Sequence, residues 1–237
     1  MNAIPEIKDP EKYLNNSFVD SRFIELTDNK IFDIKMQYPL LGMKKAEEKC
    51  LVREEVYNML LKAAEALPAG YKFRMLDAWR PFDLQHEIYE IYSRNIIKEF
   101  RLENCSEEER NRVIRKYVSD PVRDRECPPV HTTGGAVDLT IIDADGNELD
   151  MGTGFDEFTD RTHTAYFEKV DNDTGNNDLV KENRRLLYHV MTSAGFTNLP
   201  SEWWHYDYGD RFWAYYKEKP AIYKGVFEKE EVYGCKR

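Results

Sequence analysis

Ser201-Glu202-Trp203-Trp204-His205-Tyr206-Asp207-Tyr208 is the stretch that says most about the fold and chemistry of this chain. A carboxylate and an imidazole stand three positions apart among four aromatic residues. In one continuous strand Glu202 and His205 would lie on opposite faces. They can share a site only if the chain bends between them, so that Glu202 comes from a loop and His205 begins a strand. His205 and Asp207 would then face the site, while the other side chains pack into the core, namely Trp204, Tyr206 and Tyr208.

A second stretch, Pro129-Val130-His131-Thr132-Thr133-Gly134-Gly135-Ala136-Val137-Asp138, supplies further side chains of the ligand type. If residues 136–142 form a strand, Asp138 faces a partly covered side, opposite a run of core residues. A buried carboxylate there needs a cation or hydrogen-bond donors. An edge-strand aspartate that meets solvent or an arginine is the alternative. The two glycines let the loop fold back so that His131 approaches Asp138. A surface histidine is the alternative for His131.

His131, Asp138 and His205 make a three-ligand zinc set with an open fourth position, which is the catalytic pattern. Glu202 suits the role of a base that does not bind the metal. Arg80, at a strand-to-helix junction, is the candidate cation for an oxyanion, and a plain salt bridge is its alternative. The remaining histidines lack this context: His86 on an exposed helix face, His189 in a structural position, and His163.

Strands and helices follow one another in an irregular order. Strands are predicted at 23–26 and 31–36 around the turn 27–30, at 73–79, at 136–142 and into 201–208. Helices are predicted at 53–67, 81–100, 105–117 and 181–194. Residues 147–180 form a long loop, a kind that is more often functional than idle. The order favours an α+β fold in a single domain over residues 1–237, with a central antiparallel sheet flanked by helices and an irregular lead-in over residues 1–20.

Composition narrows the class of protein. The 237 residues are 41% apolar and 13% aromatic, enough for a packed core. A net charge of −10 argues against nucleic-acid partners and against docking on anionic membranes. We expect no membrane span and no secretory signal. The cysteines form no Cys-x-x-Cys pair, which favours free thiols in a reducing cytoplasm, and one disulfide in an exported protein is the alternative: Cys50, Cys105, Cys127 and Cys235.

Together these motifs resemble the zinc D-alanyl-D-alanine dipeptidases of the type associated with vancomycin resistance, in peptidase family M15. The family patterns Ser-x-His-x-x-Gly-x-Ala-x-Asp and Glu-x-Trp-His match the stretches around His131 and His205. Asp77-Ala78-Trp79-Arg80-Pro81 is similar to the arginine element, and Met151-Gly152-Thr153-Gly154-Phe155-Asp156-Glu157-Phe158 to the run that marks the dipeptidase branch. The matches span about residues 30–210.

The resemblance implies a D-Ala-D-Ala peptidase (hedgehog-like) fold with one zinc ion per chain. His131, Asp138 and His205 would bind the zinc, Glu202 would be the base, and Arg80 would stabilise the tetrahedral intermediate. Asp156 would receive the substrate's ammonium in a closed pocket. The implied reaction is hydrolysis of the small dipeptide D-Ala-D-Ala to two D-Ala.

Two alternatives to the dipeptidase remain open. One is a D,D- or L,D-carboxypeptidase acting on peptidoglycan stems. The other is a non-catalytic module that binds wall peptides, against which Glu202 argues. The sequence leaves the oligomeric state open.

Two departures from the family bear on the substrate. The family's serine before the first zinc histidine is Pro129, which removes a hydroxyl. The family's Lys-Tyr after the early strand is Lys35-Met36, which predicts the loss of a pocket phenol. The exact dipeptide preference therefore stays open.

Overall fold

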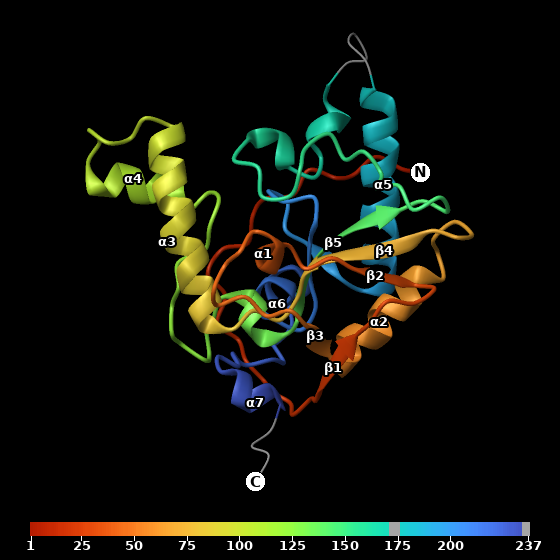
Figure 1. Cartoon of the computed structure of the whole chain (residues 1–237), viewed down its shortest axis with the longest axis horizontal. Helices are drawn as coiled ribbons and strands as arrows, with labels where there is room; N and C mark the ends of the chain where they lie inside the picture. The colour runs from red at the N-terminus through yellow and green to blue at the C-terminus, as the bar shows by residue number, and fades with distance from the viewer. Residues whose placement is uncertain (171–175, 234–237) are drawn as a thin grey trace.

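A five-stranded sheet forms the centre of the computed structural model, which describes residues 1–170 and 176–233 (Figure 1). The strand order is β2 (Phe32–Ile34), β4 (Lys72–Asp77), β5 (Ala136–Ile142), β7 (His205–Asp207) and β6 (Thr197–Asn198). β2 runs parallel to β4, and the other neighbours are antiparallel. The α+β class with helices around a central sheet is thus confirmed, and only the edge strand β2 departs from an antiparallel arrangement.

The central strand β5 brings the candidate site residues together through its register. Asp138 stands opposite Asp77 of β4 and opposite His205 of β7. All seven residues of β5 are buried, and Asp138 is 2% exposed. The expectation of a partly covered side for Asp138 was therefore wrong, because both faces of this strand are covered.

The strands predicted on either side of the turn at 27–30 are present but do not pair with each other. β1 (Phe23–Leu26) pairs antiparallel with β3 (Cys50–Arg53) in a separate two-stranded sheet. β3 was not predicted; it is a four-residue strand that leads directly into a helix. Such short apolar runs carry little periodicity.

Two amphipathic helices, α2 (Glu54–Ala64) and α5 (Asn177–Ala194), pack against each other and contribute to the main core with the sheet (Figure 1). Leu60 of α2 and Leu187 of α5 are fully buried in that core. α5 begins four residues before the predicted start at 181, and Gly195 ends it with φ 120°. A positive φ at this position suits glycine.

The helices α3 (Phe82–Glu99) and α4 (Glu107–Ile114) form a hairpin that projects from the body of the molecule (Figure 1). Ser106 caps α4 by accepting a hydrogen bond from the Glu109 amide at 3.2 Å, as its position before an acidic run predicts. The hairpin packs in an apolar cluster separate from the main core, which it shares with Tyr38 of the body, and its return turn at 115–119 leads back to the candidate site.

The remaining elements are short. They are the helices α1 (Gln37–Leu40), α6 (Arg211–Lys217) and α7 (Lys229–Tyr233), and the 3-10 turns η1 (Val130–Thr133), η2 (Asp160–Thr162) and η3 (Tyr166–Glu168). Residues 1–20 hold one isolated bridge, Asn16 to Ala221.

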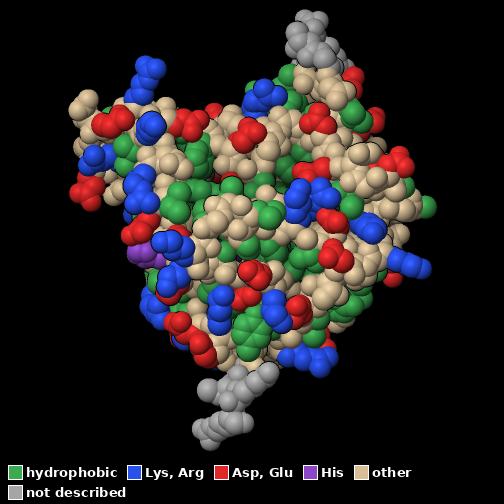
Figure 2. Space-filling view, viewed as in Figure 1, with side chains coloured by type: hydrophobic (Ala, Val, Ile, Leu, Met, Phe, Trp, Pro, Cys, Tyr) green, Lys and Arg blue, Asp and Glu red, His purple; other side chains and the backbone are tan. Residues whose placement is uncertain are grey.

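Acidic and basic side chains are intermixed over the face drawn in Figure 2. Within the two described ranges, none of the helices combines the length and the apolar character needed to cross a lipid bilayer. Cys50, Cys105 and Cys127 are free thiols, and Cys235 lies outside the described residues.

Candidate active site

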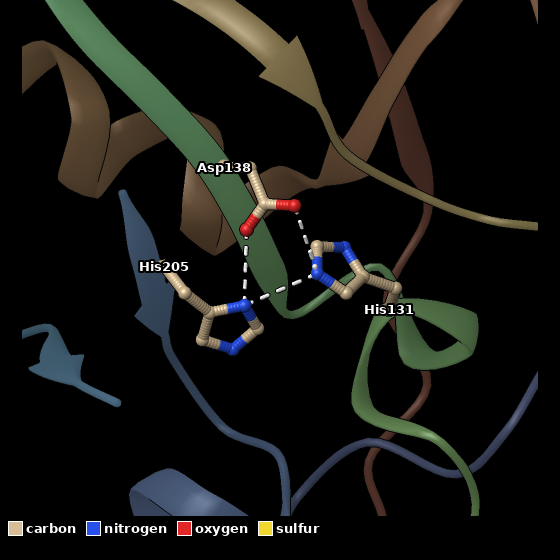
Figure 3. A group of neighbouring side chains, drawn as sticks. All are labelled: His131, Asp138 and His205. Atoms are coloured by element: carbon tan, nitrogen blue, oxygen red, sulfur yellow. Dashed lines mark hydrogen bonds and ion pairs between the residues drawn. The ribbon is translucent and has the colours of Figure 1, made fainter. Parts of the chain in front are cut away.

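His131, Asp138 and His205 point toward one another from three separate elements (Figure 3). His131 comes from η1, Asp138 from β5 and His205 from the first position of β7. His131 Nε2 lies 3.2 Å from His205 Nδ1. The Asp138 oxygens lie 3.4 Å from His131 Nε2 and 3.0 Å from His205 Nδ1. All three residues are buried.

The outer nitrogens of the two imidazoles fix which way their lone pairs point. His131 Nδ1 lies 2.9 Å from the Ala78 carbonyl oxygen, and His205 Nε2 lies 2.8 Å from Asp207 Oδ1. A carbonyl and a carboxylate only accept hydrogen bonds, so each outer nitrogen donates. His131 Nε2 and His205 Nδ1 are then the nitrogens that face the Asp138 carboxylate, and each can bind a cation there in place of a proton.

The electrostatics favour a positive charge at that point. Burial raises the pKa of Asp138, but His131 and His205 outweigh it and hold this pKa well below its usual range. Burial lowers the pKa of His205, but the carboxylates of Asp207 and Asp138 raise it well above the usual range. The carboxylate of Asp138 stays ionised and the imidazole of His205 favours a bound proton, so the three converging side chains suit a cation.

The spacing of the donors matches a zinc site. Ligands about 2.0–2.1 Å from a tetrahedral zinc ion lie roughly 3.3 Å from one another. The two nitrogens lie 3.2 Å apart, and each lies near a different Asp138 oxygen, with Oδ1 3.0 Å from His205 Nδ1 and Oδ2 3.4 Å from His131 Nε2, so the separations are close to this value. The residue types, two imidazoles and a carboxylate, are ordinary zinc ligands. The three residues therefore fit the metal that the sequence predicted.

Glu202 lies beside the cluster on a turn, and the predicted bend before His205 is confirmed. The Glu202 amide donates to the Leu199 carbonyl at 3.0 Å, and the His205 amide donates to the Glu202 carbonyl at 3.3 Å. Glu202 Oε2 lies 3.8 Å from His205 Nδ1. The side chain keeps 25% exposure, yet burial of its carboxyl group raises its pKa to about 8, with Asp138 and Asp156 adding to the effect.

Arg80 is fixed beside the cluster by hydrogen bonds from all three of its nitrogens. Nε and Nη2 donate to Asp77 Oδ2 at 2.9 and 2.7 Å, and Nη1 donates to Gln85 Oε1 at 2.7 Å. Nη2 also donates to the Tyr38 hydroxyl at 3.1 Å and lies 3.8 Å from Asp138 Oδ2. Arg80 therefore forms the salt bridge to Asp77 that was the alternative for this residue. It also lines the site cavity, where a cation for an oxyanion would have to lie.

Asp156 lies across the same cavity, and two tyrosines hold it. The hydroxyls of Tyr38 and Tyr92 donate to Asp156 Oδ2 at 2.9 and 2.7 Å. Burial raises the pKa of Asp156 to about 6, although both hydrogen bonds lower it. Both of these bonds go to Oδ2, so within the described residues Oδ1 remains for another donor.

Sequence reasoning missed Tyr38 and Tyr92. Met36, which stands where the family has a tyrosine, packs in the main core. Tyr38, two positions later, brings a phenol into the pocket instead. The expected loss of a pocket phenol was therefore wrong. Tyr92 continues the apolar face of α3 one turn after Ile88, so its position in the sequence predicts a core residue and not a pocket residue.

The loop that carries Asp156 is tied to α5 by the buried Arg184. Its guanidinium donates to the carbonyl oxygens of Met151, Arg161 and His163 at 2.8, 2.9 and 2.7 Å. Burial lowers the pKa of Arg184 to about 9. These bonds hold both ends of the stretch from 151 to 163 against the body of the molecule.

Two adjoining cavities meet at the site. The inner cavity, about 50 Å³, is lined by the three candidate ligands, Arg80, Tyr38 and Tyr92. An outer chamber of about 350 Å³ shares the residues at its boundary, which are Tyr117, Val118, Ser119, Asp156, Leu199, Glu202 and Phe212. His163 lines this outer chamber, whereas His86 pairs with Glu90 on the surface and His189 contacts the Asn2 carbonyl.

Comparison with known proteins places the chain among peptidases. Residues 40–223 match a family described as D-ala-D-ala dipeptidase. A D-alanyl-D-alanine dipeptidase of Escherichia coli is 31% identical over 162 residues, 68% of this chain and 68% of that protein. One from Synechocystis is 30% identical over 155 residues, 62% of this chain and 63% of its own length, so the match spans less than two thirds of that protein.

Among solved structures, VanYB in complex with D-alanine-D-alanine is 15% identical, with a TM-score of 0.41. The alignment covers 82% of this chain and 88% of that one.

Proposed function

This chain belongs to the D-Ala-D-Ala dipeptidase family, as its motifs predicted, and from that membership we propose that it hydrolyses D-alanyl-D-alanine to two molecules of D-alanine. The observation that carries the proposal is the convergence of two imidazole nitrogens and the Asp138 carboxylate on one point, with the Glu202 carboxylate 3.8 Å from a converging nitrogen.

His131, Asp138 and His205 would hold one zinc ion per chain. Zinc at this position would supply Lewis acidity, which polarises a carbonyl and lowers the pKa of water. A divalent cation would also oppose the rise in the pKa of Glu202, because it favours the ionised carboxylate next to it. Glu202 then accepts a proton from the attacking water and delivers it to the leaving amine as the peptide bond breaks.

Arg80 and Asp156 act on opposite ends of the dipeptide. Arg80 is cationic and fixed beside Asp138, where it stabilises the negative charge that develops on the carbonyl oxygen. The free Oδ1 of Asp156 receives the substrate's ammonium. The Tyr38 hydroxyl donates to Asp156 and accepts from Arg80, so it holds the two groups at a fixed separation.

The direct test is an assay of the purified zinc-loaded protein with D-Ala-D-Ala and, separately, with a stem pentapeptide that ends in D-Ala-D-Ala. We expect release of D-alanine from the dipeptide and at least about tenfold lower kcat/KM for the pentapeptide, because the peptide lacks the ammonium that Asp156 would pair with. L-Ala-L-Ala is the control for stereochemistry. Equal turnover of dipeptide and pentapeptide would contradict a dipeptidase.

A carboxypeptidase that acts on stem peptides is the second candidate, and the outer chamber is the observation that favours it. The chamber adjoins the inner cavity at Asp156 and Glu202 and offers about 350 Å³ for residues beyond a dipeptide. In this case the pentapeptide would be the better substrate in the same assay.

The pH dependence of substrate binding should report on Asp156. Only the ionised carboxylate attracts an ammonium, and the pKa of Asp156 is about 6, above its ordinary value. We therefore expect KM for D-Ala-D-Ala to fall as the pH rises from about 5 to 7. Asp156→Asn should raise KM by roughly tenfold to a hundredfold, as expected for loss of a hydrogen bond to a charged group. It should also remove this pH dependence.

Tyr92→Phe is the matched variant for this measurement. It removes one of the two donors that lower the pKa of Asp156, so the midpoint of the KM profile should move to higher pH. Comparison of each profile with that of the parent separates Asp156 from other titrating groups. An Asp156→Asn variant with unchanged KM at pH 7 would place the ammonium elsewhere.

A further inference from the structure

Behind His205, on the side away from the metal site, lies a pair of buried carboxyl groups. Asp207 and Asp210 are both 0% exposed. Asp207 Oδ1 accepts the hydrogen bond from His205 Nε2 at 2.8 Å. Asp210 Oδ1 accepts from the backbone amides of Phe212 and Trp213 at 2.9 and 3.1 Å, which makes Asp210 the N-cap of α6.

The two carboxyl groups differ in what their hydrogen-bonded oxygens contact. Asp207 Oδ1 contacts the imidazole of His205, whereas Asp210 Oδ1 contacts backbone amides of α6. Among the described residues, neither Oδ2 atom has a hydrogen-bond partner. Asp207 is therefore the carboxyl group placed to act on the imidazole.

We propose that Asp207 is a positioning residue for the metal ligand His205. Asp207 Oδ1 accepts the Nε2 hydrogen, which turns Nδ1 toward His131 and Asp138 and makes Nδ1 the nitrogen that binds the metal. A carboxylate behind a ligating imidazole also makes the imidazole a stronger donor to the metal. This proposal rests on the proposed zinc site.

The two histidine ligands differ in this respect. His131 Nδ1 donates to the Ala78 carbonyl oxygen at 2.9 Å, with Asp77 Oδ2 farther away at 3.5 Å, whereas His205 Nε2 donates directly to the Asp207 carboxylate at 2.8 Å. Substitution of Asp207 therefore removes the hydrogen-bond partner of His205, whereas the carbonyl partner of His131 belongs to the backbone. A change at Asp207 can thus weaken zinc binding while all three ligands stay in place.

The test is zinc affinity of the full-length protein, measured on the metal-free form by competition with a chelator of known affinity. Asp207→Asn keeps the size of the side chain and an acceptor oxygen but removes the charge. We expect it to weaken zinc binding by about 10- to 100-fold, the usual effect of removing an outer-shell partner.

Two matched variants should stay close to the parent affinity. Asp210→Asn makes the same acid-to-amide change and retains an oxygen to cap α6, but it does not remove the acceptor of the His205 Nε2 hydrogen. Thr140→Val changes a fully buried residue two positions from Asp138 on the same strand, whose hydroxyl has no partner among the described residues. An effect of Thr140→Val as large as that of Asp207→Asn would mean that any core change weakens the site, and it would overturn the proposal.

The remaining outcomes distinguish failure of the role proposed for Asp207 from failure of the proposed zinc site. Tight zinc binding by the parent with unchanged affinity in a folded Asp207→Asn variant would overturn the role of Asp207 alone. A parent that binds no zinc would overturn the site as well. Should Asp207→Asn fail to fold, histidine ¹⁵N NMR of the zinc-loaded parent decides: His205 must carry its proton on Nε2, and coordination through Nε2 would refute the proposal.

Discussion

Replacing Glu202 by glutamine should abolish turnover of D-Ala-D-Ala and leave zinc in place. The amide has nearly the shape of the carboxylate, but it cannot accept a proton from water. Removal of a general base typically costs 10²- to 10⁴-fold in rate, so we expect kcat to fall by at least about 10³-fold in this buried site. Zinc should remain because Glu202 is not among the three converging donors.

The measurement pairs zinc content by atomic absorption with kcat on the same sample. Glu148→Gln is the control, because it makes the same chemical change at the far end of β5, where Glu148 pairs with Arg74 at 3.2 Å. Turnover at the parent rate by zinc-loaded Glu202→Gln would show that another group is the base.

Replacing Asp138 by asparagine should remove both the metal and the activity. Asp138 supplies the only anionic donor of the three, and its carboxylate contacts both histidines. An amide oxygen carries no charge to balance a divalent cation. Because removal of an outer-shell partner alone weakens metal binding 10- to 100-fold, loss of this ligand should weaken zinc affinity by more than about 10²-fold.

Chelation of the parent protein should reproduce this loss without a mutation. Dialysis against a strong chelator should abolish turnover, and one equivalent of zinc should restore it. Zinc should also raise the melting temperature of the parent, because a ligand that binds only the folded state stabilises it. It should not raise that of Asp138→Asn.

His189→Ala is the control for zinc held by unrelated histidines, because this side chain contacts the Asn2 carbonyl away from the site. Full activity of Asp138→Asn after chelation would rule out a metal-dependent reaction at this cluster.

The metal cluster could be predicted because its geometry is set by short separations along the chain. Seven positions and a glycine turn separate His131 from Asp138, and the alternation of strand residues directs Asp138 and His205. Three positions separate Glu202 from His205, and only a bend lets them meet. Such constraints act within one loop or strand, where the local backbone geometry determines which side chains can approach one another.

The pocket around Asp156 could not be predicted in the same way. Its partners Tyr38 and Tyr92 lie 118 and 64 positions away, so no local spacing relates them to Asp156. The pairing of β1 with β3 and the parallel edge strand β2 are likewise contacts between distant segments. Only the packing of the sheet against its helices brings these segments together.

The sequence by itself therefore determined the α+β class, the candidate ligand set and the bend before His205, because these depend on local spacing and alternation. The tertiary structure decided which distant groups hold those residues: Tyr38 and Tyr92 on Asp156, Tyr38 on Arg80, and the Ala78 carbonyl on His131. The physical reason is that a hydrogen bond to a buried side chain requires a donor and an acceptor in one place, and burial makes an unpaired group costly. Which partner satisfies each group follows from the packing of the whole chain.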